Sequence, residues 1–303
     1  MDIRTSDSSH FLRNIFIGRS SLSGLVITGL SLAATLFVSA AEVRTDSVES
    51  GDGVRIVYDV RGQGDPTLLF VHCWAGNRFF WRDQADAFAD KYQVVTLDLG
   101  GHGESGRNRK HWSILGLSED VRTVANALKL EHIILIGHSM GGPVSLEAVR
   151  LLPGRVLGVV LVDTMHNVEV PRSMESAQAD AAKLRSDFGG YMGDLSSVFT
   201  KTSDPSIRHW VEKQALVADP AVCIALKLDT PNLDLKKLFT NARVPIRAIN
   251  AKPPLSDPTN VEGNRKYADY SAILMDDVGH FVELERPKEF NENLSKCLVE
   301  LSK

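Results

Sequence analysis

Residues 132–144 read HIILIGHSMGGPV, and this sequence combines the patterns of a strand, a sharp turn and the start of a helix. Apart from His132, residues 132–136 are apolar and mostly β-branched, which is typical of a buried strand. The glycines that flank Ser139 permit a sharp turn, and Pro143 suits the first turn of a helix. A G-x-S-x-G sequence between a strand and a helix raises the serine hydroxyl above the end of the sheet and turns the Met140 N–H toward any developing oxyanion. The stretch therefore predicts Ser139 as a nucleophile.

Similar strands and helices alternate on both sides of this stretch. Strands are predicted at residues 54–60, 67–71, 93–97, 132–136, 156–162, 246–250 and 271–275. Helices are predicted at residues 78–89, 118–128, 143–152 and 287–301. Such alternation predicts an α/β fold, with a mostly parallel central sheet and helices on both faces.

One long segment lacks strand patterns. Residues 163–243 are polar and helix-prone, with helices expected at residues 174–188, 205–218 and 221–228. Some 80 residues are too many for a loop in a compact domain. The segment is predicted to be a helical cap inserted over one end of the sheet.

The amino terminus differs from the rest of the chain. Three arginines precede an uncharged apolar run at residues 22–38, and small residues follow up to Ala41. This pattern predicts a cleaved signal peptide, and hence a secreted or periplasmic protein without stable membrane association. The alternative is an N-terminal membrane anchor, because the run has about the minimum length for a span. The expected parts are the signal peptide 1–41, the core 42–163, the cap 164–242 and the second part of the core 243–303.

The composition excludes several classes of protein. A hydrophobic content of 43% argues against disorder, and a net charge of -4 argues against nucleic-acid binding. The cysteines Cys73, Cys223 and Cys297 are too few and too scattered for a disulfide framework or a metal cluster. The composition leaves the oligomeric state and the disulfide status of these cysteines open.

Three further motifs complete a recognisable series. HCWA at residues 72–75 follows an apolar strand, DLGGHGES occupies residues 98–105, and GHF occupies residues 279–281 near the carboxyl end. In this order around GHSMGG, they make residues 54–301 resemble the α/β-hydrolase fold family, in particular serine esterases with a helical cap.

The resemblance implies roles for several residues. His280 would be the catalytic base, and the N–H groups of Trp74 and Met140 would form the oxyanion hole. Cys73 stands where the family usually has glycine. Candidate substrate-binding residues are His72, Phe79 and Phe80, although His72 could be structural and the two phenylalanines could be core residues.

The catalytic acid has two candidates. Asp163 follows the strand at residues 156–162, whose carboxyl end faces the ligand crevice in such sheets. Asp257 is the first acid after the strand at residues 246–250, where most family members carry theirs. Asp163 is favoured, and Asp257 is the alternative.

The resemblance implies hydrolysis of small carboxylic esters through an acyl-enzyme, with no metal or cofactor. A lactonase, a C–C bond hydrolase or a cofactor-free perhydrolase would use the same triad. The alternative from another class is a weakly catalytic protein that binds a ligand.

Overall fold

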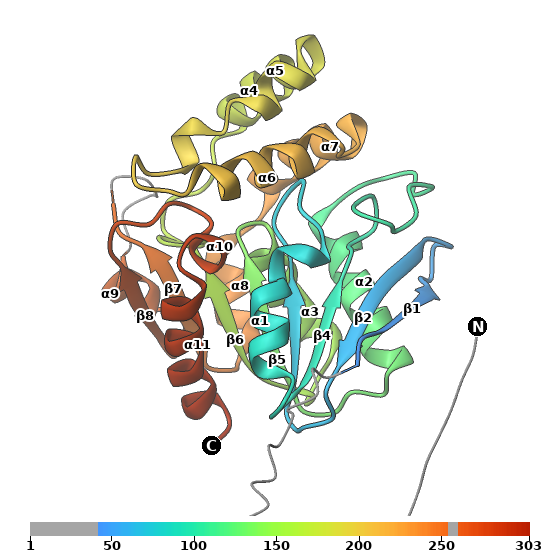
Figure 1. Cartoon of the computed structure of the whole chain (residues 1–303), viewed down its shortest axis with the longest axis vertical. Coiled ribbons are helices and arrows are strands. Elements are labelled where there is room, and N and C mark those ends of the chain that lie inside the picture. Colours follow the sequence, from blue (N-terminus) through green and yellow to red (C-terminus); the bar gives the residue numbers. More distant parts are fainter. Residues whose placement is uncertain (1–41, 254–259) are drawn as a thin grey trace, which may run out of the picture. The chain divides into compact units, whose positions relative to one another are not determined.

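The computed structural model describes residues 42–253 and 260–303, and its core is an eight-stranded sheet (Figure 1). The predicted signal peptide, residues 1–41, lies outside the described residues. The strand order is β1-β2-β4-β3-β5-β6-β7-β8, and among these described strands only the pairings β1–β2 and β2–β4 are antiparallel. The strands are β1 (Arg44–Glu49), β2 (Arg55–Arg61), β3 (Thr67–Val71), β4 (Gln93–Leu97), β5 (Ile133–His138), β6 (Val156–Val162), β7 (Ile246–Ala251) and β8 (Tyr270–Met275). The predicted α/β class with a mostly parallel sheet is therefore confirmed.

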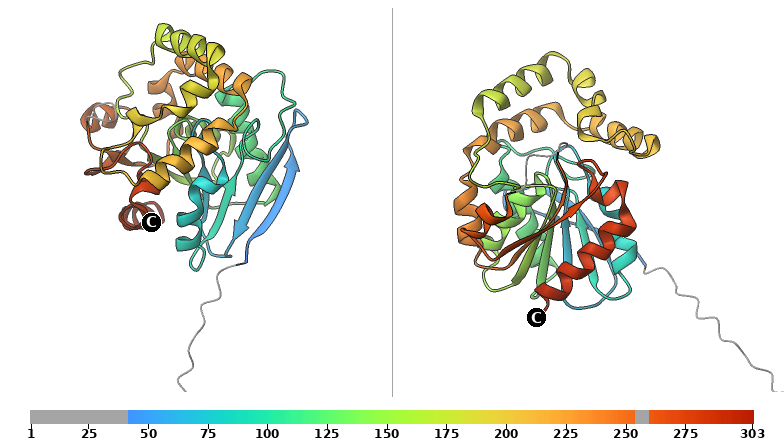
Figure 2. Two further views of the ribbon diagram at one scale, coloured as in Figure 1. Left: turned by 45° about the horizontal axis from the view of Figure 1, so that its top comes forward. Right: turned by 90° about the vertical axis from the view of Figure 1, so that its left-hand side faces the viewer.

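Helices cover both faces of this sheet (Figure 2). One face is covered by α2 (Ile114–Ala127), α3 (Gly141–Leu151) and α8 (Leu235–Ala242). The other face is covered by α1 (Arg82–Phe88) and α11 (Pro287–Leu301). Successive strand residues such as Leu68 and Leu69 are both fully buried, in different apolar clusters. Burial on two faces explains the continuous apolar strands.

Two elements near the amino end differ from the prediction made from the sequence. Strand β1 has the polar sequence RTDSVE, and it lies exposed at the edge of the sheet. Its sequence has no apolar alternation, which explains why it was missed. The helix predicted at residues 78–89 is a short 3-10 helix, η1 (Arg78–Trp81), followed by α1.

The insertion between β6 and β7 is helical throughout its regular elements. These are α4 (Met174–Ser186), α5 (Phe188–Gly193), η2 (Ser196–Val198), α6 (Pro205–Leu216), α7 (Pro220–Asp229), η3 (Thr230–Asn232) and α8. Figures 1 and 2 place α4 to α7 beyond the carboxyl ends of the parallel strands. In contrast, α8 packs against α3, and its Phe239 side chain is fully buried in the core. The predicted cap range of 164–242 thus includes α8, which belongs with α2 and α3 to the helices that cover one face of the sheet.

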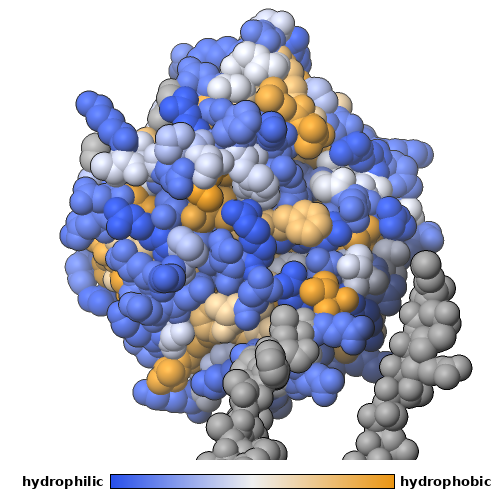
Figure 3. All heavy atoms as spheres, viewed as in Figure 1, coloured by the Kyte–Doolittle hydropathy of each residue, from blue (hydrophilic) through white to orange (hydrophobic). Residues whose placement is uncertain are grey.

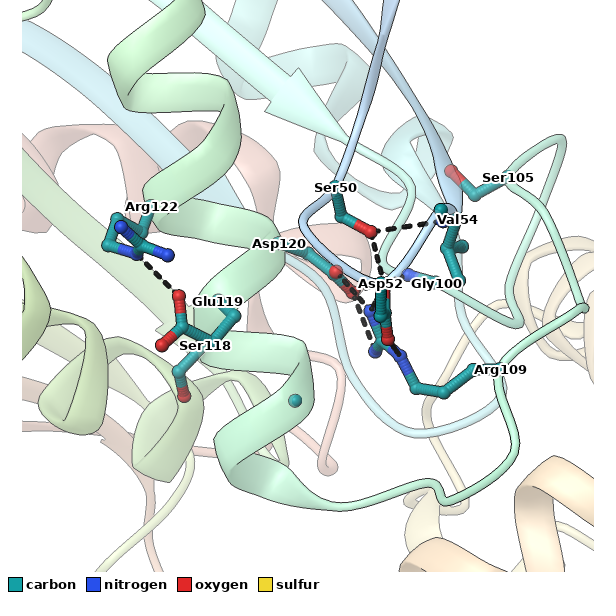
Figure 4. Close-up of polar contacts among 12 residues, drawn as sticks. Ser50, Asp52, Val54, Gly100, Ser105, Arg109, Ser118, Glu119, Asp120 and Arg122 are labelled. Carbon is teal, nitrogen blue, oxygen red and sulfur yellow. Dashed lines mark hydrogen bonds and ion pairs between the residues drawn. The ribbon is translucent and has the colours of Figure 1, made fainter.

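A buried arginine fastens the loop that follows β4 (Figure 4). The Arg109 side chain is 5% exposed and binds Asp52 and Asp120, with a nitrogen–oxygen distance of 2.6 Å to each. Asp120 also accepts a hydrogen bond of 2.9 Å from the Gly100 N–H. Because buried charges are costly unless they are paired, this network holds the turn after β1, the glycine-rich loop and α2 in one arrangement.

The side seen in Figure 3 is mostly hydrophilic, with separate small apolar patches. Among the described residues, no helix combines the length and apolar character that crossing a bilayer requires.

Candidate active site

The turn between β5 and α3 holds Ser139 in a strained conformation. Ser139 has a φ of 52°, in the left-handed region that side chains disfavour. Gly137 and Gly141, two residues before and after Ser139, must be glycine because a side chain at either position would collide with the backbone. A Cβ at Gly137 would lie 2.2 Å from the Gly141 carbonyl oxygen, and one at Gly141 would lie 2.3 Å from the Val71 carbonyl oxygen. Strain in such a turn is typical of functional sites.

Ser139 opens onto a cavity of about 1260 Å³. The cavity is bounded by residues at the carboxyl ends of the strands and by residues of the insertion. The sheet side contributes Trp74, Phe80, Ser139, Met140, Asp163, His166, His280 and Phe281, and the insertion contributes, among others, Tyr191, Met192, Val211, Leu226 and Lys227. A concave site with apolar walls and a few polar groups is typical of small-molecule binding.

His280 and Asp163 meet in this cavity. The distance from His280 Nδ1 to Asp163 Oδ2 is 2.6 Å, and Asp163 is 1% exposed. Asp163 Oδ1 also accepts a hydrogen bond of 2.9 Å from the Ala251 N–H. Burial raises the pKa of Asp163, but hydrogen bonds from His166 and His280 outweigh it and hold the pKa well below its usual value. The alternative acid, Asp257, lies outside the described residues.

The ring of His280 is suited to act as a base. Burial lowers the pKa of His280 below 6.5, and the nearby charge of His138 lowers it further, although the bond to Asp163 opposes both effects. A neutral ring that donates its Nδ1 proton to Asp163 leaves Nε2 free to accept another proton.

A second histidine, His166, binds the same acid, and the sequence analysis missed it. Its Nε2 lies 3.0 Å from Asp163 Oδ1, and its side chain lines the cavity. Asp163 and Met165 both have positive φ, which folds the segment back on itself. The amide of Asn264 donates to the carbonyls of Met165 and His166 and fixes this bend. The available signal was a histidine three residues after an acid at a strand end.

Two residues that line the cavity together with Ser139 have backbone N–H groups without a hydrogen-bond acceptor among the described residues. Trp74 and Met140 line the cavity, and within the described part of the chain neither N–H has a protein partner. The residue with positive φ in the loop after β3 is Ala75, at 57°. Cys73 therefore needs no left-handed conformation, and a cysteine fits at the position where the resemblance implies glycine. The Trp74 indole donates to the Cys223 carbonyl at 3.0 Å, which ties this loop to the insertion.

Of the predicted substrate-binding residues, only Phe80 lines the cavity. Its ring packs against Trp210 and Phe281, with centroid distances of 4.8 and 6.0 Å. Phe79 is 44% exposed and does not line the cavity, because successive residues of the short 3-10 helix point in different directions. The expectation for Phe79 is corrected accordingly.

His72 also lies away from the cavity. It is completely buried, and its Nε2 accepts a hydrogen bond of 3.0 Å from the Leu99 N–H. Its Nδ1 lies 2.8 Å from the Cys73 carbonyl oxygen and donates to it. Burial lowers the pKa of His72 to about 4, so the ring is neutral. Its role is to join two loops, and the expected substrate contact is corrected.

The cysteines and the acidic residues form no metal site in the described ranges. Cys73, Cys223 and Cys297 are buried and unpaired. No group of three or more histidine, cysteine, aspartate or glutamate side chains within residues 42–253 and 260–303 is arranged to hold a metal ion.

Known proteins show the same architecture. Residues 66–215 match a family model described as alpha/beta hydrolase fold. A thermophilic esterase from Thermogutta terrifontis superposes with a TM-score of 0.75 and 21% identity, over 86% of this chain and 100% of the esterase. A structure titled "Est816 as an N-Acyl homoserine lactone degrading enzyme" superposes with a TM-score of 0.70 and 26% identity, over 83% of this chain and 99% of that one.

Similarity to curated sequences is more local. The dihydrolipoyllysine-residue acetyltransferase component of the acetoin cleaving system from Cupriavidus necator is 37% identical over 111 residues, which is 37% of this chain and 30% of that protein. This chain matches three such relatives over only 28–42% of their own lengths. Because the family match contains the strained serine turn and the fold match extends over the sheet and the insertion, this chain belongs to the α/β-hydrolase fold family.

Proposed function

We propose that this protein is a serine esterase that cleaves small carboxylic esters through an acyl-enzyme. The observation that carries the proposal is the 2.6 Å contact between His280 and a buried Asp163 in the cavity that Ser139 also lines. Asp163 keeps the His280 ring in the tautomer whose Nε2 accepts a proton, and it stabilises the imidazolium that forms.

In the proposed reaction, the Ser139 hydroxyl attacks the ester carbonyl while His280 takes its proton. The N–H groups of Trp74 and Met140 stabilise the oxyanion, because they are already fixed and lack acceptors in the described part of the chain. His280 then gives its proton to the leaving alcohol. A water molecule, activated by the same ring, attacks the acyl-serine and releases the acid.

The substrate class is supported by the cavity and by the similar structures. Aromatic and aliphatic residues such as Phe80, Phe281 and Leu226 suit an apolar acyl or alcohol group. One similar structure is named as an esterase. A lactonase is the second candidate, because another similar structure is titled as an enzyme that degrades N-acyl homoserine lactones, and a lactone is a cyclic ester.

A fluorophosphonate probe tests the class of the enzyme. We expect stoichiometric labelling of Ser139 in the wild type and no labelling of Ser139→Ala, with both proteins folded by circular dichroism. A folded wild type without labelling would reject the serine-hydrolase mechanism. A p-nitrophenyl ester series of increasing chain length and an N-acyl homoserine lactone series then separate the two substrate classes. Faster turnover of the lactones would favour the second candidate.

Export of the mature protein is also proposed, from residues 1–41. N-terminal sequencing of the protein recovered from the periplasm or the medium would identify a cut before Ala41 or Glu42. An intact amino terminus in the membrane fraction would favour the anchor.

A further inference from the structure

A buried pair of ionisable side chains, His138 and Glu283, lies next to the proposed base His280. Neither side chain takes part in the reaction steps described above. His138 precedes the nucleophile in the chain, and Glu283 lies on α10 (Val282–Glu285), three residues after His280. Both side chains are completely buried. Two ionisable groups in the interior need a reason, because burying them costs several kcal/mol per charge before pairing.

His138 contacts the base itself. Its Nε2 lies 2.9 Å from the backbone carbonyl oxygen of His280, and the two rings have centroids 4.7 Å apart. Its Nδ1 lies 3.1 Å from Glu283 Oε1, outside hydrogen-bonding geometry, so that contact is an ion pair. The nitrogen facing a carbonyl must carry a proton, and the charge of Glu283 favours a proton on the other nitrogen.

The surroundings of the pair favour a charged His138. Burial alone lowers the pKa of His138, but the Glu283 carboxylate and the Cys73 thiol outweigh it and raise the pKa well above 6.5. Within the described part of the chain, neither carboxylate oxygen of Glu283 has a hydrogen-bond donor. The imidazolium is therefore the charge that compensates Glu283.

Other contacts hold the remaining backbone groups around His280. The His280 N–H donates to the Val198 carbonyl at 2.8 Å, and the Glu285 carboxylate accepts from the N–H groups of Gly279 and Phe281 at 3.2 and 3.3 Å. Among the described residues, the carbonyl of His280 is held by His138 alone. Loss of this bond would leave one side of the base's backbone unrestrained.

We propose that His138 and Glu283 are positioning residues, with His138 fixing the His280 carbonyl so that the ring faces Ser139 and Glu283 holding His138 in place. This inference rests on the proposed function, because it assumes that His280 is the base. A displacement of about 1 Å at a catalytic group can cost about 100-fold in rate.

Two matched double variants of the full chain separate positioning from packing. His138→Gln/Glu283→Gln removes both charges but keeps an amide N–H that can reach the His280 carbonyl. His138→Leu/Glu283→Gln removes the charges and the donor. We measure kcat and KM on a p-nitrophenyl ester, the fluorophosphonate labelling rate, and the thermal midpoint of each.

The leucine variant is expected to lose about 30- to 100-fold in kcat, with KM changed by less than about threefold. The glutamine variant is expected to recover most of that loss, to within about fivefold of the wild type. Equal kcat values for the two folded variants would overturn the proposal, whatever their thermal midpoints.

A further variant covers failure of the leucine protein to fold. In His138→Asn/Glu283→Gln the shorter amide stays polar but does not reach the His280 carbonyl, so the same loss in kcat is expected and wild-type kcat would again overturn the proposal. Labelling of wild-type Ser139 keeps the two proposals apart. If wild-type Ser139 is not labelled, the esterase mechanism is refuted, and the positioning role of His138 and Glu283 is refuted with it. If wild-type Ser139 is labelled but the variants are equally active, only the positioning role is refuted.

Discussion

Replacing Asp163 by asparagine is the sharpest test of the active-site geometry. Asp163 Oδ2 faces His280 Nδ1 at 2.6 Å, and Oδ1 accepts from the Ala251 N–H at 2.9 Å. The backbone N–H can only donate, so the asparagine oxygen must take the Oδ1 position. The amide NH₂ then faces His280 Nδ1 as a donor, where the reaction needs an acceptor.

This substitution stabilises the wrong tautomer of His280. A ring that accepts at Nδ1 carries its proton on Nε2, where it cannot accept the proton of the Ser139 hydroxyl. In a serine protease the equivalent exchange lowers kcat by about 10⁴, and the same factor is expected here, equivalent to about 5.4 kcal/mol. The fold should persist, because size and the bond to Ala251 are kept.

The assay is kcat on a p-nitrophenyl ester at pH 8, beside circular dichroism. Asp257→Asn serves as the matched control and should keep kcat within about twofold, since Asp163 already supplies the carboxylate that His280 Nδ1 needs. A folded Asp163→Asn protein within tenfold of the wild type would refute the tautomer argument. A large loss confined to Asp257→Asn would instead identify Asp257 as the acid.

Two other predictions concern pH and the serine turn. Because the pKa of His280 is lowered from 6.5, its ring stays neutral to lower pH, and the acidic limb of kcat/KM should have its midpoint below 6.5; a midpoint above 6.5 would contradict this. Gly141→Ala places a Cβ 2.3 Å from the Val71 carbonyl and should cost about 1–3 kcal/mol in urea unfolding, whereas Gly51→Ala enters open space and should change stability by less than about 0.5 kcal/mol. Equal unfolding midpoints for the two alanine variants would argue against the steric role of Gly141.

Local patterns were enough to predict most of the fold. The apolar run at Val156–Val162 coincides with β6, and the predicted helix at residues 287–301 coincides with α11. Both elements are long or strongly apolar, so the pattern of neighbouring residues is enough to predict that they are buried. Strand β1 was missed because an exposed edge strand needs no apolar face, and its pairing with β2 depends on a distant segment.

The parts of the site that depend on distant contacts were harder to predict. The serine turn is encoded within a single short stretch, GHSMGG. The contact of His166 with Asp163 requires two residues of positive φ and an asparagine from a distant part of the chain, Asn264. The pairing of His138 with Glu283 joins β5 to a helix near the carboxyl end, and no local pattern distinguishes a buried glutamate on α10 from a solvated one.

The two ends of the insertion meet at Asp163. This residue follows β6, where the insertion begins, and it accepts a hydrogen bond from Ala251 at the end of β7, the first strand after the insertion. Strands β6 and β7 are paired, and the Asp163 N–H donates to the Ile249 carbonyl, so both ends are fixed by the sheet. Helices can be lengthened, shortened or exchanged between such anchored ends without displacing the carboxylate. Evolution could therefore change the shape of the cavity independently of the carboxylate that is proposed to orient His280.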